Sequence, residues 1–263
     1  MIPLERAFDR TAGKYVGWCR LLHPLFRYDF IYDAALRRRR VRAGSGMDLD
    51  FSIVVAFWPR LLQGLGLNLF FAVVGFALGC ALGLACYAAS RLAPMRLLTY
   101  AYIQAVRGMP FYLLLLWIYF GLASEFGLAL SGTQAIIMAI GIMSSAFAAE
   151  VFRSGFEAID EGQVEAGRAL GMTTLAINRY ILFPQVIRTT VPPLLNILII
   201  CLKAATFAAV VGIPELVSVA QEISLNHYRP FEAYISIAAI LIVTVLCISL
   251  LARLIERRLA FNQ

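Results

Sequence analysis

The sequence predicts an all-α integral membrane protein with about five transmembrane helices and one long polar loop. Hydrophobic residues make up 61% of the 263 residues and charged residues only 15%, and the mean hydropathy is +0.78. A water-soluble domain has an apolar share of roughly 45–50% even when glycine is counted. The composition therefore excludes a disordered chain, a nucleic-acid-binding domain and a polar enzyme as first interpretations.

Five apolar runs are long enough to cross a bilayer, which takes about 20 residues per helix. Charge, glycine or proline bounds each run. The expected spans cover residues 61–90, 97–123, 132–152, 191–213 and 231–251. We expect the second span to bend between Gln104 and Pro110, where a polar stretch ends in proline.

The distribution of arginine predicts the orientation, because basic residues favour the cytoplasmic side of membrane helices. Nine arginines follow the first, third and fifth spans: Arg91, Arg96, Arg153, Arg168, Arg179, Arg188, Arg253, Arg257 and Arg258. After residue 47, only Arg60 and Arg229 fall in the connections on the opposite side. We therefore expect the N-terminal end of the first span outside and the C-terminus in the cytoplasm.

Residues 1–46 disagree with this orientation, because they hold ten of the 23 basic residues and four of the 16 acidic ones. Charge, histidine and proline interrupt their aromatic-rich stretch, so it makes a poor spanning helix. No signal-peptide pattern fits it either. Two interpretations stay open. Either residues 1–46 are an extension before a natural start at Met47 and residues 47–263 form the transmembrane domain, or they form a basic interfacial helix that binds anionic lipid.

The connection between the third and fourth spans, about residues 154–190, is too polar to enter lipid and too regular to be disordered. We expect Asp160 to start a short helix and Gly171 to end it in a left-handed conformation. Thr173 or Thr174 can cap a second helix, which we expect Pro184 to close. Two short helices joined at a glycine predict a compact protrusion that docks to another protein.

The spacing of residues in this loop is specific. The pattern consists of Glu165, Ala166, Gly171 and, after a nine-residue gap, Ile181 and Pro184. It resembles the EAA loop of ABC-importer permeases, in which this segment forms the cytoplasmic coupling helix.

Two positions depart mildly from that pattern: Gly167, where alanine is common, and Phe183, where leucine usually precedes the proline. Other elements similar to polar amino-acid permeases are Arg107-Gly108-Met109-Pro110, Glu150 with Phe152, Arg153 and Gly155, and Ile213-Pro214-Glu215-Leu216. The common KDTSL element is altered here to the segment from Lys203 to Phe207. The closing QEISLNHYRPFEAYISIAA resembles the histidine, basic amino-acid and opine branch.

The resemblance implies a permease subunit of the bacterial inner membrane that moves polar amino acids or opines by alternating access. It also implies several partners: a second permease, identical or related, two cytoplasmic ATPases, and a periplasmic solute-binding protein. Glu165 would be the charged contact of the coupling helix. No GxxxxGK[ST] nucleotide site occurs in the sequence, so we expect no cofactor in this chain and ATP in the partner subunits.

Ionisable residues inside spans are costly and tend to face a cavity or a partner. Lys203, with Thr206 and Phe207 beside it, either lines the translocation path or pairs structurally. Glu150 is a further candidate for the translocation path, but it lies nearer the cytoplasmic end, where pairing with Arg153 is the simpler interpretation.

Other residues in or beside the spans have structural interpretations. Small residues at i, i+4 and i+8 favour close helix packing over a substrate role, and Gly75, Gly79 and Gly83 have this spacing. Arg107, with Gly108 and Pro110, is expected to anchor a bend at the interface. Asn68 and Gln104 are expected to form hydrogen bonds between helices.

The sequence predicts no catalytic or metal centre. His23 and His227 are far apart, and Cys80, Cys86, Cys201 and Cys247 lie in separate apolar runs, which favours core packing. A self-contained secondary transporter remains the alternative, although it would need ion-coupling residues and usually internal repeats. An intramembrane enzyme would need convergent catalytic residues, and the few candidates do not converge.

Overall fold

The computed structural model describes residues 49–260, and side chains as far as Arg257. The chain divides into two units, Met1–Asp50 and Phe51–Gln263. The predictions about residues 1–46 and a natural start at Met47 fall outside the described residues. Only the second unit is considered below.

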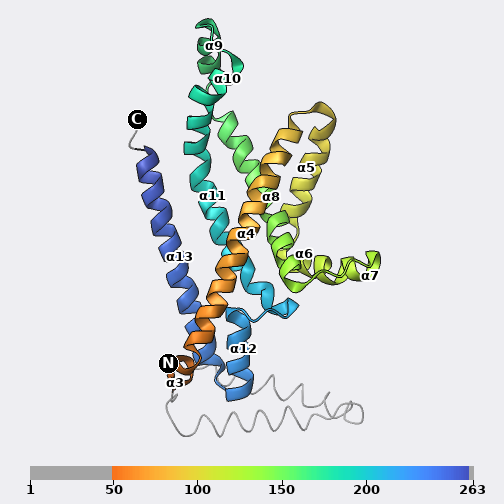
Figure 1. The fold of residues 1–263 in the computed structure, drawn as a ribbon, viewed down its shortest axis with the longest axis vertical. Helices are drawn as coiled ribbons and strands as arrows, with labels where there is room; N and C mark the ends of the chain where they lie inside the picture. The colour runs from red at the N-terminus through yellow and green to blue at the C-terminus, as the bar shows by residue number, and fades with distance from the viewer. Residues whose placement is uncertain (1–48, 261–263) are drawn as a thin grey trace, which may run out of the picture. The chain divides into compact units, whose positions relative to one another are not determined.

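Every regular element between residues 49 and 260 is helical (Figure 1). In chain order these are α3 (Ser52–Ala56), α4 (Trp58–Ser90), α5 (Ala93–Gly108), α6 (Phe111–Leu116), η1 (Trp117–Gly121), α7 (Leu122–Phe126), α8 (Gly132–Glu157), α9 (Glu161–Ala169), α10 (Thr174–Ile177), η2 (Asn178–Leu182), α11 (Phe183–Ala205), η3 (Thr206–Val211), α12 (Leu216–His227) and α13 (Pro230–Ala260). Four continuous helical segments are long and apolar enough to span a membrane, and a bent pair makes a fifth candidate.

The second expected span is broken as well as bent. Its two parts, Ala93–Gly108 and Phe111–Phe126, meet at 106°. Pro110 precedes the second part in an extended conformation with φ −58° and ψ 131°, and its ring removes the N–H that a continuing helix would need. The prediction of a bend is confirmed, and at 106° the bend divides the expected span into two helices.

The fourth span is longer than predicted, because α10, η2, α11 and η3 form one continuous helical segment, Thr174–Val211. Pro184 therefore does not close a short helix, and that prediction is wrong. The π-helical turn η2 shifts the hydrogen-bond register, with the Phe183 N–H donating to the Asn178 carbonyl. Pro184 then falls in the first turn of α11, where a missing N–H is tolerated.

The core is built around the contact between α4 and α8, the most extensive in the described part. Gly75, Gly79 and Gly83 are buried in it. An added Cβ at Gly75 would lie 2.5 Å from Ile140 Cγ2, and one at Gly83 would lie 2.7 Å from Ala148 Cβ. These three glycines therefore let two long helices approach closely.

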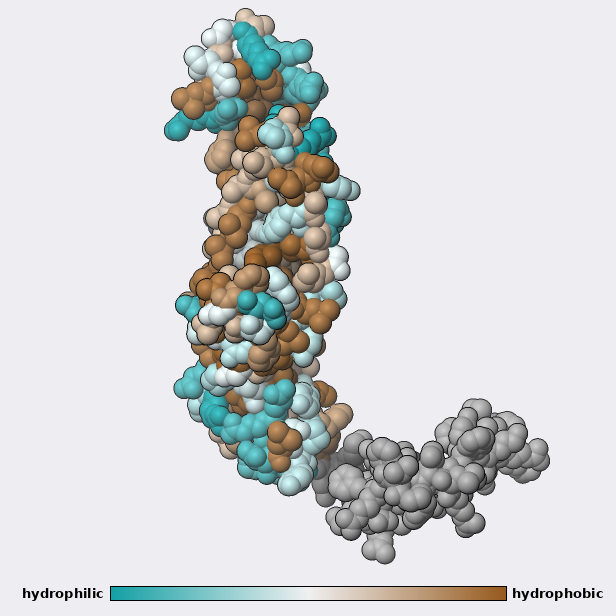
Figure 2. Space-filling view, turned by 90° about the vertical axis from the view of Figure 1, so that its right-hand side faces the viewer, coloured by the Kyte–Doolittle hydropathy of each residue, from teal (hydrophilic) through white to brown (hydrophobic). Residues whose placement is uncertain are grey.

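The unit has two distinct ends. Figure 1 shows α9 and α10 at the same end as the α4–α5 turn and the last turns of α13, which we name the loop end. At the other end, named the α12 end, lie α3, α12 and the start of α13. Hydrophilic residues gather at both ends of the face in Figure 2, and apolar residues predominate between them.

Candidate coupling loop and membrane path

Helix α9 has defined caps at both ends. The Asp160 side chain accepts a 2.8 Å hydrogen bond from the Gly162 N–H at its start. At its end, the Gly171 N–H donates to the Arg168 carbonyl at 2.9 Å and the Met172 N–H to the Gly167 carbonyl at 3.1 Å. Gly171 has φ +74°, so these two bonds form a Schellman motif around a left-handed glycine. The predicted start and stop are confirmed.

The second helix of the loop, α10, begins at Thr174, three residues after Gly171. The Thr173 hydroxyl accepts a 3.3 Å hydrogen bond from the Ala176 N–H and caps α10, so of the two threonines it is Thr173 that caps. Helix α10 runs on through η2 into α11, so the loop and the membrane-embedded part share one continuous helical segment.

Gly167 is the point where α9 rests on the second helix. It is buried, and an added Cβ would lie 3.1 Å from both Ile177 Cγ1 and Ile181 Cδ1. The Gln185 amide donates to Gln163 Oε1 at 2.6 Å and closes the same contact. The two helices therefore pack as one body, which we name the α9–α10 unit, and Gly167 and Ile181 form its interior.

The outer surface of the α9–α10 unit combines apolar and acidic side chains. Leu170 is 82% exposed and Leu175 is 76% exposed, while Glu165 and Ala166 are exposed on α9. The Glu165 carboxylate forms no hydrogen bond or ion pair with any residue between 49 and 260. Exposed large apolar side chains beside a carboxylate are typical of a surface that contacts another protein.

The candidate residues for the membrane path lie in two separate places. Lys203 is exposed near the end of α11, and the Thr206 hydroxyl donates to its carbonyl at 2.7 Å. The Phe207 ring contacts the rings of Phe111 and Tyr112, with centroids 5.7 and 5.9 Å apart. Lys203, Thr206 and Phe207 therefore lie together beside the break in the second span.

Glu150 lies apart from this cluster, at the loop end of α8. Its carboxylate accepts a 2.8 Å hydrogen bond from Arg153, which also donates to Glu157 at 2.6 Å. The structure thus contains the pairing with Arg153 that was one of the two interpretations of Glu150. It does not bring Glu150 to Lys203.

Sequence reasoning missed Phe111 and Tyr112 as neighbours of Phe207. The sequence did contain a local signal for them, because two aromatic residues follow Pro110 directly and begin a new helix there.

Arg107 lies before the same break, with its guanidinium 5.6 Å from the centre of the Phe147 ring. Gln104 is exposed and makes no hydrogen bond within the described range, contrary to expectation.

Glu215 anchors α12 at the α12 end. Its fully buried carboxylate accepts hydrogen bonds from the Val217 and Ser218 N–H groups at 3.0 and 3.1 Å. The Asn68 side chain of α4 accepts from the Leu216 N–H at 3.3 Å, so Asn68 does bond between helices. Burial raises the pKa of Glu215, although the two backbone donors act in the opposite direction.

A second contact joins α4 to α12 at the surface. The Arg60 guanidinium donates to both oxygens of Glu222 at 2.5 Å, and its hydrogen bond holds the pKa of Glu222 below the ordinary value. Sequence reasoning did not single out this pair, because the two residues are far apart in the chain.

Within residues 49–260, no cluster of three or more His, Cys, Asp and Glu could hold a metal ion. Cys80, Cys86, Cys201 and Cys247 are free thiols. The candidate functional features in the described range are thus the α9–α10 unit and the cluster near Lys203.

Long apolar helices with a polar helical unit inserted between two of them define a multi-pass membrane protein. The chain belongs to the family of binding-protein-dependent transport system inner membrane components, which it matches over residues 75–261. It is therefore a permease subunit of an ABC importer, and members of this family associate with an ATPase and a binding protein.

Several relatives are similar over almost their whole length. The arginine transport system permease protein ArtQ of Bacillus subtilis is 31% identical, covering 82% of this chain and 100% of the relative. The glutamine transport system permease protein GlnP of Escherichia coli K12 is 31% identical, covering 81% and 99%. The nopaline transport system permease protein NocM of Agrobacterium fabrum is 29% identical, covering 79% and 91%.

Solved structures agree with this family. An amino acid ABC transporter crystallised with histidines has a chain 38% identical, with a TM-score of 0.75 and coverage of 81% of this chain and 100% of that one. The methionine ABC transporter MetNI, at 21% identity and a TM-score of 0.66, supports the fold alone.

Proposed function

We propose that this chain forms the membrane path of an importer for polar amino acids or related small solutes such as opines. The names of its relatives, which refer to arginine, glutamine and nopaline, support this substrate class. Lys203 beside the Phe207 cluster supports it chemically, because a lysine attracts the carboxylate that these solutes share. In this proposal Lys203, Thr206 and Phe207 line the path, with Phe111 and Tyr112 shaping it.

The loop end is assigned to the cytoplasm. The α4–α5 turn, the α9–α10 unit and the last turns of α13 lie there together, and basic residues concentrate in these segments. This assignment puts the N-terminal end of α4 outside and the C-terminus in the cytoplasm. The α12 end then faces the periplasmic solute-binding protein.

The observation that carries the mechanism is the rigidity of the α9–α10 unit and its continuity with α11. Two cytoplasmic ATPases bind ATP, close, and push on the unit in each of two permease subunits, which form a homodimer or a heterodimer. Glu165 supplies the charged contact and Leu170 and Leu175 the apolar one. Movement of α11 then opens the path outward, and hydrolysis resets it.

Co-purification tests the docking role. The tagged full-length protein is isolated in mild detergent as wild type, Glu165→Arg and the control Glu125→Arg, and bound proteins are identified by mass spectrometry. Glu125 is an exposed carboxylate on α7, outside the α9–α10 unit. Because a mispaired charge at an interface costs several kcal/mol, we expect roughly tenfold or greater loss of the ATPase from Glu165→Arg alone.

A second permease band in the wild-type sample would establish a heterodimer. Equal ATPase recovery from all three proteins would reject Glu165 as the contact. Absence of an ATPase from all of them would remove the mechanical basis of the proposal.

A further inference from the structure

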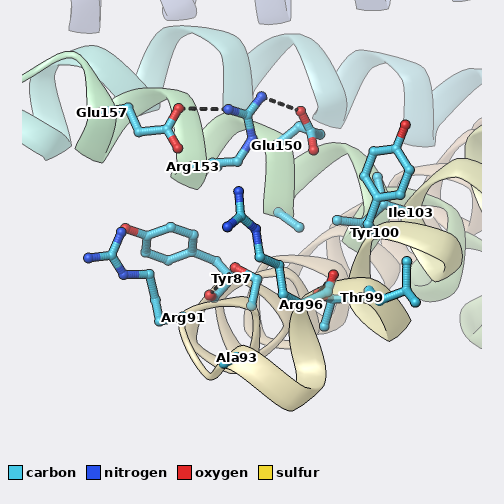
Figure 3. Close-up of a pocket in the computed structure, with 13 residues that line it drawn as sticks. Tyr87, Arg91, Ala93, Arg96, Thr99, Tyr100, Ile103, Glu150, Arg153 and Glu157 are labelled. Carbon is cyan, nitrogen blue, oxygen red and sulfur yellow. Dashed lines mark hydrogen bonds and ion pairs between the residues drawn. The ribbon is translucent and has the colours of Figure 1, made fainter.

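A cleft at the loop end lies outside the α9–α10 unit and the Lys203 cluster. It has a volume of about 930 Å³ and lies where the end of α4 and the first half of α5 face α8. Figure 3 shows the charged and aromatic side chains that line it. Of the residues proposed for coupling or the path, only Glu150 belongs to it.

On the α8 wall one arginine is shared by two carboxylates, so this wall by itself carries one excess negative charge. Arg153 donates to Glu150 at 2.8 Å and to Glu157 at 2.6 Å, so one guanidinium serves both carboxylates. The opposite wall carries Arg91 and Arg96, which form no ion pair with any acidic residue in the described range. Three arginines and two glutamates leave the lining with an excess of one positive charge.

The two unpaired arginines line the same wall of the cleft. In Figure 3 the Arg96 guanidinium reaches across the cleft toward Arg153, and Arg91 lies on the same wall beside Tyr87. Tyr87 is itself fixed, because its ring stacks on Phe156 of α8 with centroids 5.0 Å apart. Guanidinium groups of this kind match the oxygens of a phosphate, which they bind through paired hydrogen bonds.

The rim of the cleft is apolar as well as basic. Leu97 is 76% exposed and Tyr100 is 60% exposed, and both line it. Leu92, at the turn beside Arg91, is 59% exposed. A soluble anion needs no such surface, whereas a phospholipid brings its phosphate and its acyl chains to the end of a membrane helix together.

We propose that this cleft binds the phosphate group of a phospholipid, with Arg91 and Arg96 holding the headgroup and Leu92 and Leu97 contacting the acyl chains. The site is independent of the substrate and of Glu165. Failure of the co-purification test would leave it intact, and its own failure would leave the coupling role intact.

Native mass spectrometry of the full-length protein with its co-purifying subunits tests the proposal. The probes are phosphatidylglycerol, phosphatidylcholine and glycerol 3-phosphate, titrated in detergent. The test variant is Arg91→Gln with Arg96→Gln. The control is Arg253→Gln with Arg257→Gln, which removes the same charge from exposed positions on α13, outside the cleft.

We expect the test variant to bind phosphatidylglycerol about tenfold or more weakly than wild type, and the control variant to match wild type. Phosphatidylcholine should bind more weakly than phosphatidylglycerol, because its choline cation faces the same arginines. Equal phosphatidylglycerol binding by wild type and both variants would overturn the proposal. If glycerol 3-phosphate bound as tightly as phosphatidylglycerol, the phosphate chemistry would belong to a soluble anion and the lipid assignment would fall.

A variant expected to gain affinity excludes misfolding as an explanation. Glu157→Gln removes one carboxylate from the cleft and frees a donor group of Arg153 for the ligand. We expect its phosphatidylglycerol affinity to rise severalfold above wild type, an effect that damage to the fold cannot produce. An unchanged or lower affinity would contradict a ligand held between the two walls.

Discussion

The α9–α10 unit and α12 are both short helical elements beside long ones, but different forces hold them. The α9–α10 unit is fixed by the helix caps at Asp160, Gly171 and Thr173 and by the close contact at Gly167, and Leu170 and Leu175 stay exposed. Helix α12 is fixed by buried polar side chains, Glu215 and Asn68, and its apolar face is covered.

The difference follows from what each element must present. A docking surface has to leave apolar side chains exposed, so less side-chain burial is available to hold it, and local caps and one close helix contact hold it instead. At α12 the apolar residues are buried, and the helix N-terminus can be satisfied by a carboxylate that is buried with it. Substitutions at Gly171 and Glu215 therefore should fail in different ways.

The largest effect is expected at Gly171. In Gly171→Val a β-branched residue would have to adopt φ +74°, at a cost of about 1–2 kcal/mol or more. The protein should insert normally and bind the ATPase, while substrate-stimulated ATP hydrolysis and transport fall roughly tenfold. Transport and ATPase assays in proteoliposomes measure both.

Gly171→Asn is the matched control, because asparagine tolerates the left-handed conformation better than valine does. It should retain most of the coupling. Normal coupled transport by the valine variant would reject the view that the Gly171 turn makes the α9–α10 unit rigid.

A smaller effect is expected at Glu215. Glu215→Ala removes the cap of α12, including both bonds to Val217 and Ser218, and should destabilise the protein by about 1–2 kcal/mol. Glu215→Gln keeps one acceptor oxygen and should lose less. Thermal unfolding in detergent measures stability, and recovery of the ATPase should be the same for both variants. Loss of ATPase binding from Glu215→Ala would break the proposed separation between the two elements.

Local chemistry explains which parts of the fold could be predicted. The caps at Asp160, Gly171 and Thr173 depend on residues within one turn of one another, so the sequence was enough to place the first two and to limit the third to Thr173 or Thr174. The passage of a helix through Pro184 depends on the π-helical turn before it, which has no reliable sequence signal. The sequence analysis therefore ended the second helix of the loop at Pro184, whereas the helical segment continues to Val211.

The membrane path shows the corresponding limit for the site. Lys203, Thr206 and Phe207 stood out because an ionisable residue in an apolar run is unusual. Their aromatic neighbours Phe111 and Tyr112 come from a distant segment, and only the 106° break brings them near. The burial of Glu215 was equally hidden, because it results from the packing of α12 on α4 around Gly64 and Asn68.

The smallest effect on stability is expected from a change of pH, which acts here through the buried carboxylate of Glu215. Burial raises the pKa of Glu215 above its ordinary value of 4.5, so the folded protein binds its proton more tightly than the unfolded chain does. Its contribution to stability is then full below pH 4.5 and is lost as the pH rises through the raised pKa.

The comparison of wild type with Glu215→Gln isolates this contribution, because glutamine is similar in shape and does not titrate. The melting temperature of wild type relative to Glu215→Gln should fall as the pH increases from 4.5 toward 8. Glu222 contributes with the opposite sign, since Arg60 lowers its pKa, but it is present in both proteins and cancels. A difference that stayed constant would mean that folding does not change the pKa of Glu215. A difference that grew with pH would mean that the Val217 and Ser218 N–H donors outweigh burial and lower this pKa.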